Sequence, residues 1–290
     1  MKRFAPSPGR RGLLLTAPAL AVVAAAVAAL LSAARGGLTD DLGHGWSLSA
    51  YTDLRHRPAL LEALLLSLRI ATLSTLASAV LALAAVTAAG ATRRGRALLD
   101  ITARATLAVP HLLAAAAFGT LLAGSGLLSR LAHATGLSDG PADFPAFVGA
   151  PTPTAVLLAY AWKETPFVVV MLLAAYTPAV RDLEDAARTL GAGRSSRLRH
   201  VTLPLLAPAL TEACLLVFAF TFAAYEVPAL LGATSPRALP VEAVDAYRSI
   251  EAGDRPTALA LATVIGLVVA LAASAAAVVS RRLPRAGGPR

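Results

Sequence analysis

Ionisable side chains lie inside several long apolar runs of this 290-residue chain. A charge at the middle of a membrane costs about 2.5–3.5 kcal/mol on insertion scales, so such residues face a water-filled cavity or a partner group. Lys163 and Glu164 are neighbours, and because neighbours in a helix point about 100° apart, they are not expected to pair with each other. Lining of a solute pathway and pairing with another helix both stay open for Lys163, Glu164 and Glu226. Three further in-run charges are expected to have structural or interfacial roles: Glu62, Arg69 and Glu212.

The residue types give no support for catalysis or for a metal or cofactor site. Intramembrane hydrolysis would need Ser and His, or paired Asp, at matching depth in different spans, and Ser67 or Ser74 with His111 lacks any supporting motif. An ATP-binding phosphate loop needs a lysine after a glycine-rich turn, and neither lysine of the chain has that setting. The single cysteine, Cys214, excludes an intrachain disulfide. We therefore expect no enzyme, and ATP hydrolysis would have to be performed by a separate chain.

The segment 177–210, which follows the fourth apolar run, differs from the other polar segments. Pro178 stands where a helix can start, and apolar residues then recur at helical spacing. They form one stripe: Val180, Leu183, Ala187 and Leu190. Gly191 and Gly193 end this helix, and Gly191 is predicted to take a left-handed conformation. A basic stretch with Arg194, Arg197 and Arg199 leads to Pro204. Two interpretations stay open, an interfacial loop whose arginines contact anionic lipid and a docking element for a cytoplasmic partner.

Six apolar runs must position these residues, and each is long enough to cross a membrane. About 20 helical residues span the roughly 30 Å of hydrocarbon, and in lipid only a helix satisfies its own backbone hydrogen bonds within one segment. With 57% hydrophobic and only 15% charged residues, the chain has too little charge for a soluble protein of this length. The sequence predicts an all-α polytopic membrane protein with six transmembrane helices, within the runs 12–34, 59–89, 101–123, 153–175, 205–231 and 257–280.

The arginines set the expected topology. The formal charge of +9 would suggest nucleic acid binding in a soluble protein, but here the arginines flank apolar runs, so no nucleic acid partner is expected. With six spans, 16 basic residues lie on the side of the two termini and 7 on the opposite side. The positive-inside rule then places both termini in the cytoplasm of a cell-membrane protein. The first run is longer than the roughly 7–15 residues of a signal-peptide core, so we expect a retained helix.

The loop after the fourth run resembles a known motif. It is similar to the EAA motif of permease subunits in binding-protein-dependent ABC importers: Glu-Ala-Ala, three residues, Gly, nine residues, Ile, one residue, Leu-Pro. Asp185 replaces the usual Glu and Val201 the usual Ile, and the other positions keep their residues. The resemblance, which extends over about 59–282, implies that the ATPase-coupling residues are Glu184, Asp185, Ala186, Ala187, Gly191, Val201, Leu203 and Pro204.

The resemblance implies the type I importer fold, with a tail, first helix and outer loop in 1–58, a transmembrane domain in 59–282 that carries the coupling loop 177–204, and a C-terminal tail in 283–290. It also implies the partners: a dimer of ATP-binding subunits, a second permease subunit that is related or identical, an extracytoplasmic solute-binding protein, and membrane lipid. The stretches around Lys163, Gly191 and Glu226 look most like polyamine permeases; iron, thiamine, phosphonate and sugar permeases are the alternatives. A secondary transporter or an intramembrane enzyme is the competing class.

Overall fold

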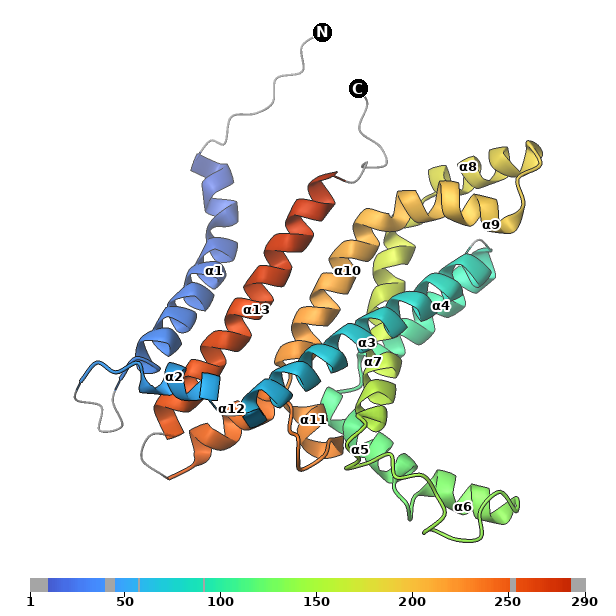
Figure 1. Cartoon of the computed structure of the whole chain (residues 1–290). Helices are drawn as coiled ribbons and strands as arrows, with labels where there is room; N and C mark the ends of the chain where they lie inside the picture. Colours follow the sequence, from blue (N-terminus) through green and yellow to red (C-terminus); the bar gives the residue numbers. More distant parts are fainter. Residues whose placement is uncertain (1–9, 40–44, 57, 91, 251–253, 283–290) are drawn as a thin grey trace. The chain divides into compact units, whose positions relative to one another are not determined.

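The chain is described here by a computed structural model that covers residues 10–39, 45–56, 58–90, 92–250 and 254–282. Within these residues it is helical, apart from turns, loops and one isolated β-bridge between Thr39 and Trp46 (Figure 1). The helices are α1 (Arg10–Gly36), α2 (Ser49–His56), α3 (Pro58–Ala89), α4 (Arg93–Leu107), α5 (His111–Leu122), α6 (Leu127–Ala134), α7 (Thr154–Ala175), α8 (Pro178–Thr189), α9 (Arg194–Arg197), α10 (Leu203–Ala223), α11 (Glu226–Leu231), α12 (Leu239–Arg248) and α13 (Asp254–Arg282), with a π-helical turn over Leu198–Thr202 before α10.

Six segments of the described chain are long and apolar enough to cross a membrane, which confirms the predicted number. Four of them agree closely with the predicted runs, and the third and fifth differ. The six candidate spans are Thr16–Gly36, Ala59–Ala89, His111–Ala134, Thr154–Ala175, Arg194–Ala223 and Asp254–Val279.

The third run is not one helix, so the prediction of a continuous span over 101–123 is wrong. α4 ends at Leu107, α5 begins at His111, and Pro110 lies between them in an extended conformation. Proline lacks an N–H, and its ring clashes with the carbonyl four residues earlier and restricts the residue before it. The candidate span therefore starts at His111 and excludes α4.

The fifth run is interrupted as well. α10 ends at Ala223, Ala224 is extended, and α11 begins at Glu226. Pro228 explains the break, because a continuous helix would place its ring against the carbonyl of Ala224. Glu226 therefore lies beyond the candidate span, contrary to the prediction of an in-span acid.

The chain divides into two compact units. One comprises residues 1–56 and 243–266. In it the Tyr51 hydroxyl lies 3.1 Å from the Ala34 carbonyl, to which it donates, and 3.4 Å from the Thr263 hydroxyl. Gly37 packs directly on the backbone of α13, since a Cβ at this position would stand 3.0 Å from the nitrogen of Ala260. Glycine is thus needed here for close approach of two backbones.

The other unit comprises residues 57–242 and 267–290 and contains the coupling segment and Lys163. α3 packs along α7 in this unit. Small side chains in α3 allow helix backbones to approach closely. One row of its buried positions recurs every three or four residues: Ala63, Ser67, Ala71, Ser74, Ser78, Ala82 and Val86. Large α7 side chains, led by Tyr160 and Leu172, fill the core beside them.

Candidate functional site

The segment between α7 and α10 is a helical hairpin whose turn depends on Gly191. Gly191 has φ +82°, which confirms the predicted left-handed conformation. Its N–H donates to Arg188 O at 3.0 Å, and the N–H of Ala192 donates to Ala187 O at 3.0 Å. This pair of bonds is the Schellman motif, which satisfies the last carbonyls of α8 and turns the chain back toward α10.

Glu184 holds the two arms of this hairpin together. The Tyr176 hydroxyl, at the end of α7, donates to Oε2 of Glu184 at 2.5 Å, and the Thr202 hydroxyl donates to Oε1. Burial and the hydrogen bond to Glu184 raise the pKa of Tyr176, which therefore stays a protonated donor. The resemblance assigns Glu184 to ATPase coupling, and in the structure its carboxylate bonds within the chain.

Arg96 fixes the base of the hairpin. Its guanidinium donates to Leu173 O at 2.8 Å and to Tyr176 O at 3.0 Å, which are carbonyls at the C-terminal end of α7. A cation at this position is favoured by the helix dipole, and it satisfies carbonyls that have no donor within the helix. Arg96 is one of the 16 basic residues predicted on the side of the two termini, and no local sequence pattern reveals its partner 77 residues away.

One face of α8 is left uncovered. Val180 is 2% exposed and packs in the core, whereas Leu183 is 52% and Leu190 88% exposed. The predicted apolar stripe is therefore divided between the core and the surface. Ala186 is exposed on the same side as Leu190, and Asp185 forms an exposed ion pair with Arg188 at 3.0 Å. α8 thus presents small and apolar side chains that a partner could cover.

The remaining motif positions lie where the second arm meets α10. Val201 is half-buried in the π-helical turn, Leu203 opens α10 and is also half-buried, and Pro204 follows it, exposed. The bond from Thr202 to Glu184 sets this segment beside α8. The structure therefore brings the two halves of the motif together.

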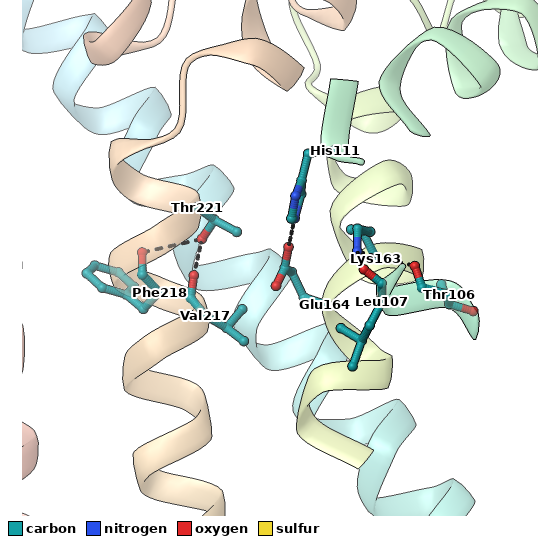
Figure 2. Close-up of polar contacts among 8 residues, drawn as sticks. All are labelled: Thr106, Leu107, His111, Lys163, Glu164, Val217, Phe218 and Thr221. Carbon is teal, nitrogen blue, oxygen red and sulfur yellow. Dashed lines mark hydrogen bonds and ion pairs between the residues drawn. The ribbon is translucent and has the colours of Figure 1, made fainter. Parts of the chain in front are cut away.

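Lys163 and Glu164 point to opposite sides of the break between α4 and α5 (Figure 2). Lys163 is 4% exposed, and its Nζ lies 3.3 Å from both Thr106 O and Leu107 O at the end of α4. Glu164 is also buried, and its Oε1 lies 2.9 Å from Nε2 of His111, the first residue of α5. Two adjacent α7 residues thus contact the two helix ends that the break creates.

The His111 ring also packs against Phe220 of α10, with ring centroids 4.6 Å apart. His111 therefore links α5 to α7 and α10. The Ser67 hydroxyl accepts from the Leu239 N–H at 2.7 Å, so the structure engages Ser67 and His111 with different partners and shows no hydrogen bond between them in the described residues. Glu226, the third candidate pathway residue, is exposed at the start of α11.

The family described as "Binding-protein-dependent transport system inner membrane component" matches residues 80–285. The chain is 42% identical over 62 residues to the trehalose/maltose transport system permease protein MalF of Thermococcus litoralis, a match that covers 21% of each chain. It is 37% identical over 94 residues to a probable molybdenum ABC transporter permease protein of Haloferax volcanii, covering 32% of this chain and 35% of the relative. With the sulfoquinovosyl glycerol transport system permease protein SmoG of Agrobacterium fabrum, identity is 30% over 82 residues, covering 28% and 27%. The matches thus span about a fifth to a third of these relatives.

The backbone is similar over almost its whole length to a solved structure. A chain in the crystal structure of a bacterial ABC transporter involved in the import of the acidic polysaccharide alginate superposes with a TM-score of 0.71 at 19% identity. The superposition covers 95% of this chain and 98% of the other. The complex of an alginate transporter with an alginate pentasaccharide-bound periplasmic protein gives 0.71 at 20% identity, covering 96% and 98%. At such identities the likeness concerns the fold.

Proposed function

The chain belongs to the family of binding-protein-dependent transport system inner membrane components, and on that premise we propose that it is the permease subunit of an ABC importer. In this function it forms part of the solute pathway through the inner membrane and couples it to ATP hydrolysis by a separate subunit. The fold expected from the resemblance, that of an ABC importer transmembrane domain, is confirmed. The proposed partners are two ATP-binding subunits, a second permease subunit, and a solute-binding protein.

The observation that carries the coupling role is the geometry of α8. Its inner face is held by Glu184 and Val180, and its outer face leaves Leu183 and Leu190 exposed. Exposed apolar side chains that a partner can cover are typical of a protein interface core. Ala186 and Gly191 add no bulk, so a cleft on the ATPase can close tightly around this end of the helix.

The proposed substrate is a carbohydrate-like polar solute. Two of the three relatives above are named for sugars or a sugar derivative, and the solved transporters are named for alginate. The polyamine expectation finds no support among these proteins. That expectation relied on acidic side chains that could contact a cation, and the carboxylate of Glu164 is buried against His111. We propose Glu226, which is exposed, as the remaining candidate for contact with the solute.

Copurification tests the function and the substrate class together. We expect the tagged chain, solubilised in mild detergent, to retain an ATP-hydrolysing subunit at a defined ratio. The solute-binding protein captured by the assembled complex should release a carbohydrate, identified by mass spectrometry. Recovery of the chain without any ATPase would contradict the importer proposal. A polyamine in the binding protein would leave that proposal standing and overturn the substrate class.

Orientation follows from the charge distribution, and we propose that the α8 end of the second unit faces the cytoplasm. Ser195 lies in α9, at the start of the fifth candidate span, and Asp139 lies after α6, outside the spans. Both residues are exposed, so they are suited to a test. In a Cys214→Ala background, a cysteine at position 139 is expected to react with an impermeant reagent added to intact spheroplasts. A cysteine at position 195 should react only after the membrane is opened. Equal labelling of both before lysis would contradict the topology.

A further inference from the structure

A polar cavity of about 550 Å³ lies behind the coupling segment. It is open on one side and is lined by the C-terminal end of α3, the inner face of α8, and the α9 arm. Its polar lining includes Thr92, Glu184, Arg188, Arg194, Ser195 and Arg197. The exposed residues Leu183 and Leu190 do not belong to the lining, so the cavity is separate from the face offered to the ATPase.

The lining carries a positive charge. Three arginines and a single acidic residue, Glu184, line the cavity. Both oxygens of the Glu184 carboxylate already accept hydrogen bonds, from Tyr176 and Thr202. Even with Arg188 paired to Asp185 outside the lining, Arg194 and Arg197 outweigh Glu184.

Hydrogen-bond donors remain for a ligand. Arg197 uses one nitrogen to donate to Ala192 O at 2.9 Å, and Arg188 uses one for Asp185 at 3.0 Å. A guanidinium has five N–H donors, so most donors of Arg188 and Arg197 are not used in these two contacts. Arg194 is exposed, and Ser195 adds a hydroxyl beside it. Planar guanidinium forks together with hydroxyl donors match the oxygens of a phosphate group.

We propose that this cavity binds a phosphate-bearing anion, supplied either as inorganic phosphate or as the headgroup of an anionic phospholipid. Because Arg188 lies on α8 and both Arg194 and Arg197 lie on α9, one bound phosphate would bridge the two arms of the hairpin. The anion would then stiffen the coupling segment from its inner side, while its outer side stays available to a partner.

The test compares single arginine replacements in the purified full-length chain. Arg194→Gln removes a guanidinium from the lining, and Arg199→Gln, an exposed arginine of the same arm outside the lining, is the matched control. Arg197 is left intact because it also holds Ala192 O. Thermal unfolding in neutral detergent is followed against sodium phosphate, with sodium chloride at equal ionic strength, and against short-chain phosphatidylglycerol, with phosphatidylcholine as its neutral counterpart.

We expect a saturable rise in the unfolding temperature of the wild-type chain and of Arg199→Gln. Arg194→Gln should need an anion concentration about tenfold higher or more for the same rise in unfolding temperature. A charge-assisted hydrogen bond contributes at least this factor to the binding affinity. A response to phosphatidylglycerol alone would identify the lipid headgroup as the source, and a response to phosphate alone would identify the free anion. Equal responses of Arg194→Gln and the wild type, or no rise with either anion, would overturn the proposal.

Discussion

Replacement of Gly191 by valine is expected to abolish transport and weaken retention of the ATPase, with normal abundance of the chain in the membrane. Gly191 has φ +82°, and an added Cβ would meet no atom within 4 Å. The penalty is therefore in the backbone, where a left-handed conformation costs a non-glycine residue about 1–2 kcal/mol and is an outlier for a β-branched one. Relief of that strain rotates the turn, breaks the Schellman bonds, and displaces Leu190, the more exposed of the two leucines offered to the ATPase.

Two further variants separate the conformational cause from others. Gly191→Asn adds a side chain of similar size but tolerates the left-handed region, so it should keep most of the transport. Asp185→Arg reverses an exposed charge and breaks the pair with Arg188 without straining the backbone, and it should weaken ATPase retention through charge alone. Transport and ATPase retention are measured in parallel for all three variants. Wild-type values for Gly191→Val would reject the coupling role of α8, and they are what an interfacial loop that only contacts lipid predicts.

The number of spans and the coupling turn could be predicted because each depends on local sequence. Length and apolar composition define a membrane helix, and glycine at the end of an amphipathic helix defines its turn. The helix breaks could not be located in this way. Pro110 and Pro228 accompany interruptions, whereas α7 continues through Pro166 and α10 through Pro208. Whether a proline ends a membrane helix depends on whether neighbouring groups satisfy the carbonyl that it frees, which is a property of the packed structure.

The partners of the charged residues could not be predicted either, because they also depend on the packed structure. The sequence shows that Lys163 and Glu164 place costly charges in an apolar run. It leaves open whether they line the solute pathway or pair with another helix. The choice between these roles depends on the break at Pro110. Only an interrupted helix ends at Leu107, where carbonyls need a donor, and begins again at His111. Glu184 was likewise assigned only to ATPase coupling, by the resemblance. Its contacts with Tyr176 and Thr202 arise only when the hairpin closes.

Lys163→Met is expected to destabilise the chain by about 1–3 kcal/mol, because Leu107 O loses its donor. Thr106 O, by contrast, keeps the Val109 N–H at 3.1 Å. The Lys163 ammonium donates to Thr106 O and Leu107 O at 3.3 Å each, and methionine keeps the length of the side chain but has no donor. These carbonyls form the negative end of the α4 dipole, so the loss of the cation adds to the cost. Lys163→Arg, which keeps charge and donors, should recover part of the stability despite its larger head.

The measurement is thermal unfolding of the purified chain in detergent, together with transport by the assembled complex. Arg69→Met is the matched control, since it removes an exposed cation from the candidate span in α3 and should leave the unfolding temperature unchanged. Glu226→Gln removes an exposed acid at the start of α11 and should alter transport without altering stability, as contact with the solute requires. If Lys163 instead lined the pathway, Lys163→Met would behave like Glu226→Gln, with wild-type unfolding and impaired transport. That result would reject the assignment of Lys163 to the broken helix and return it to the solute pathway.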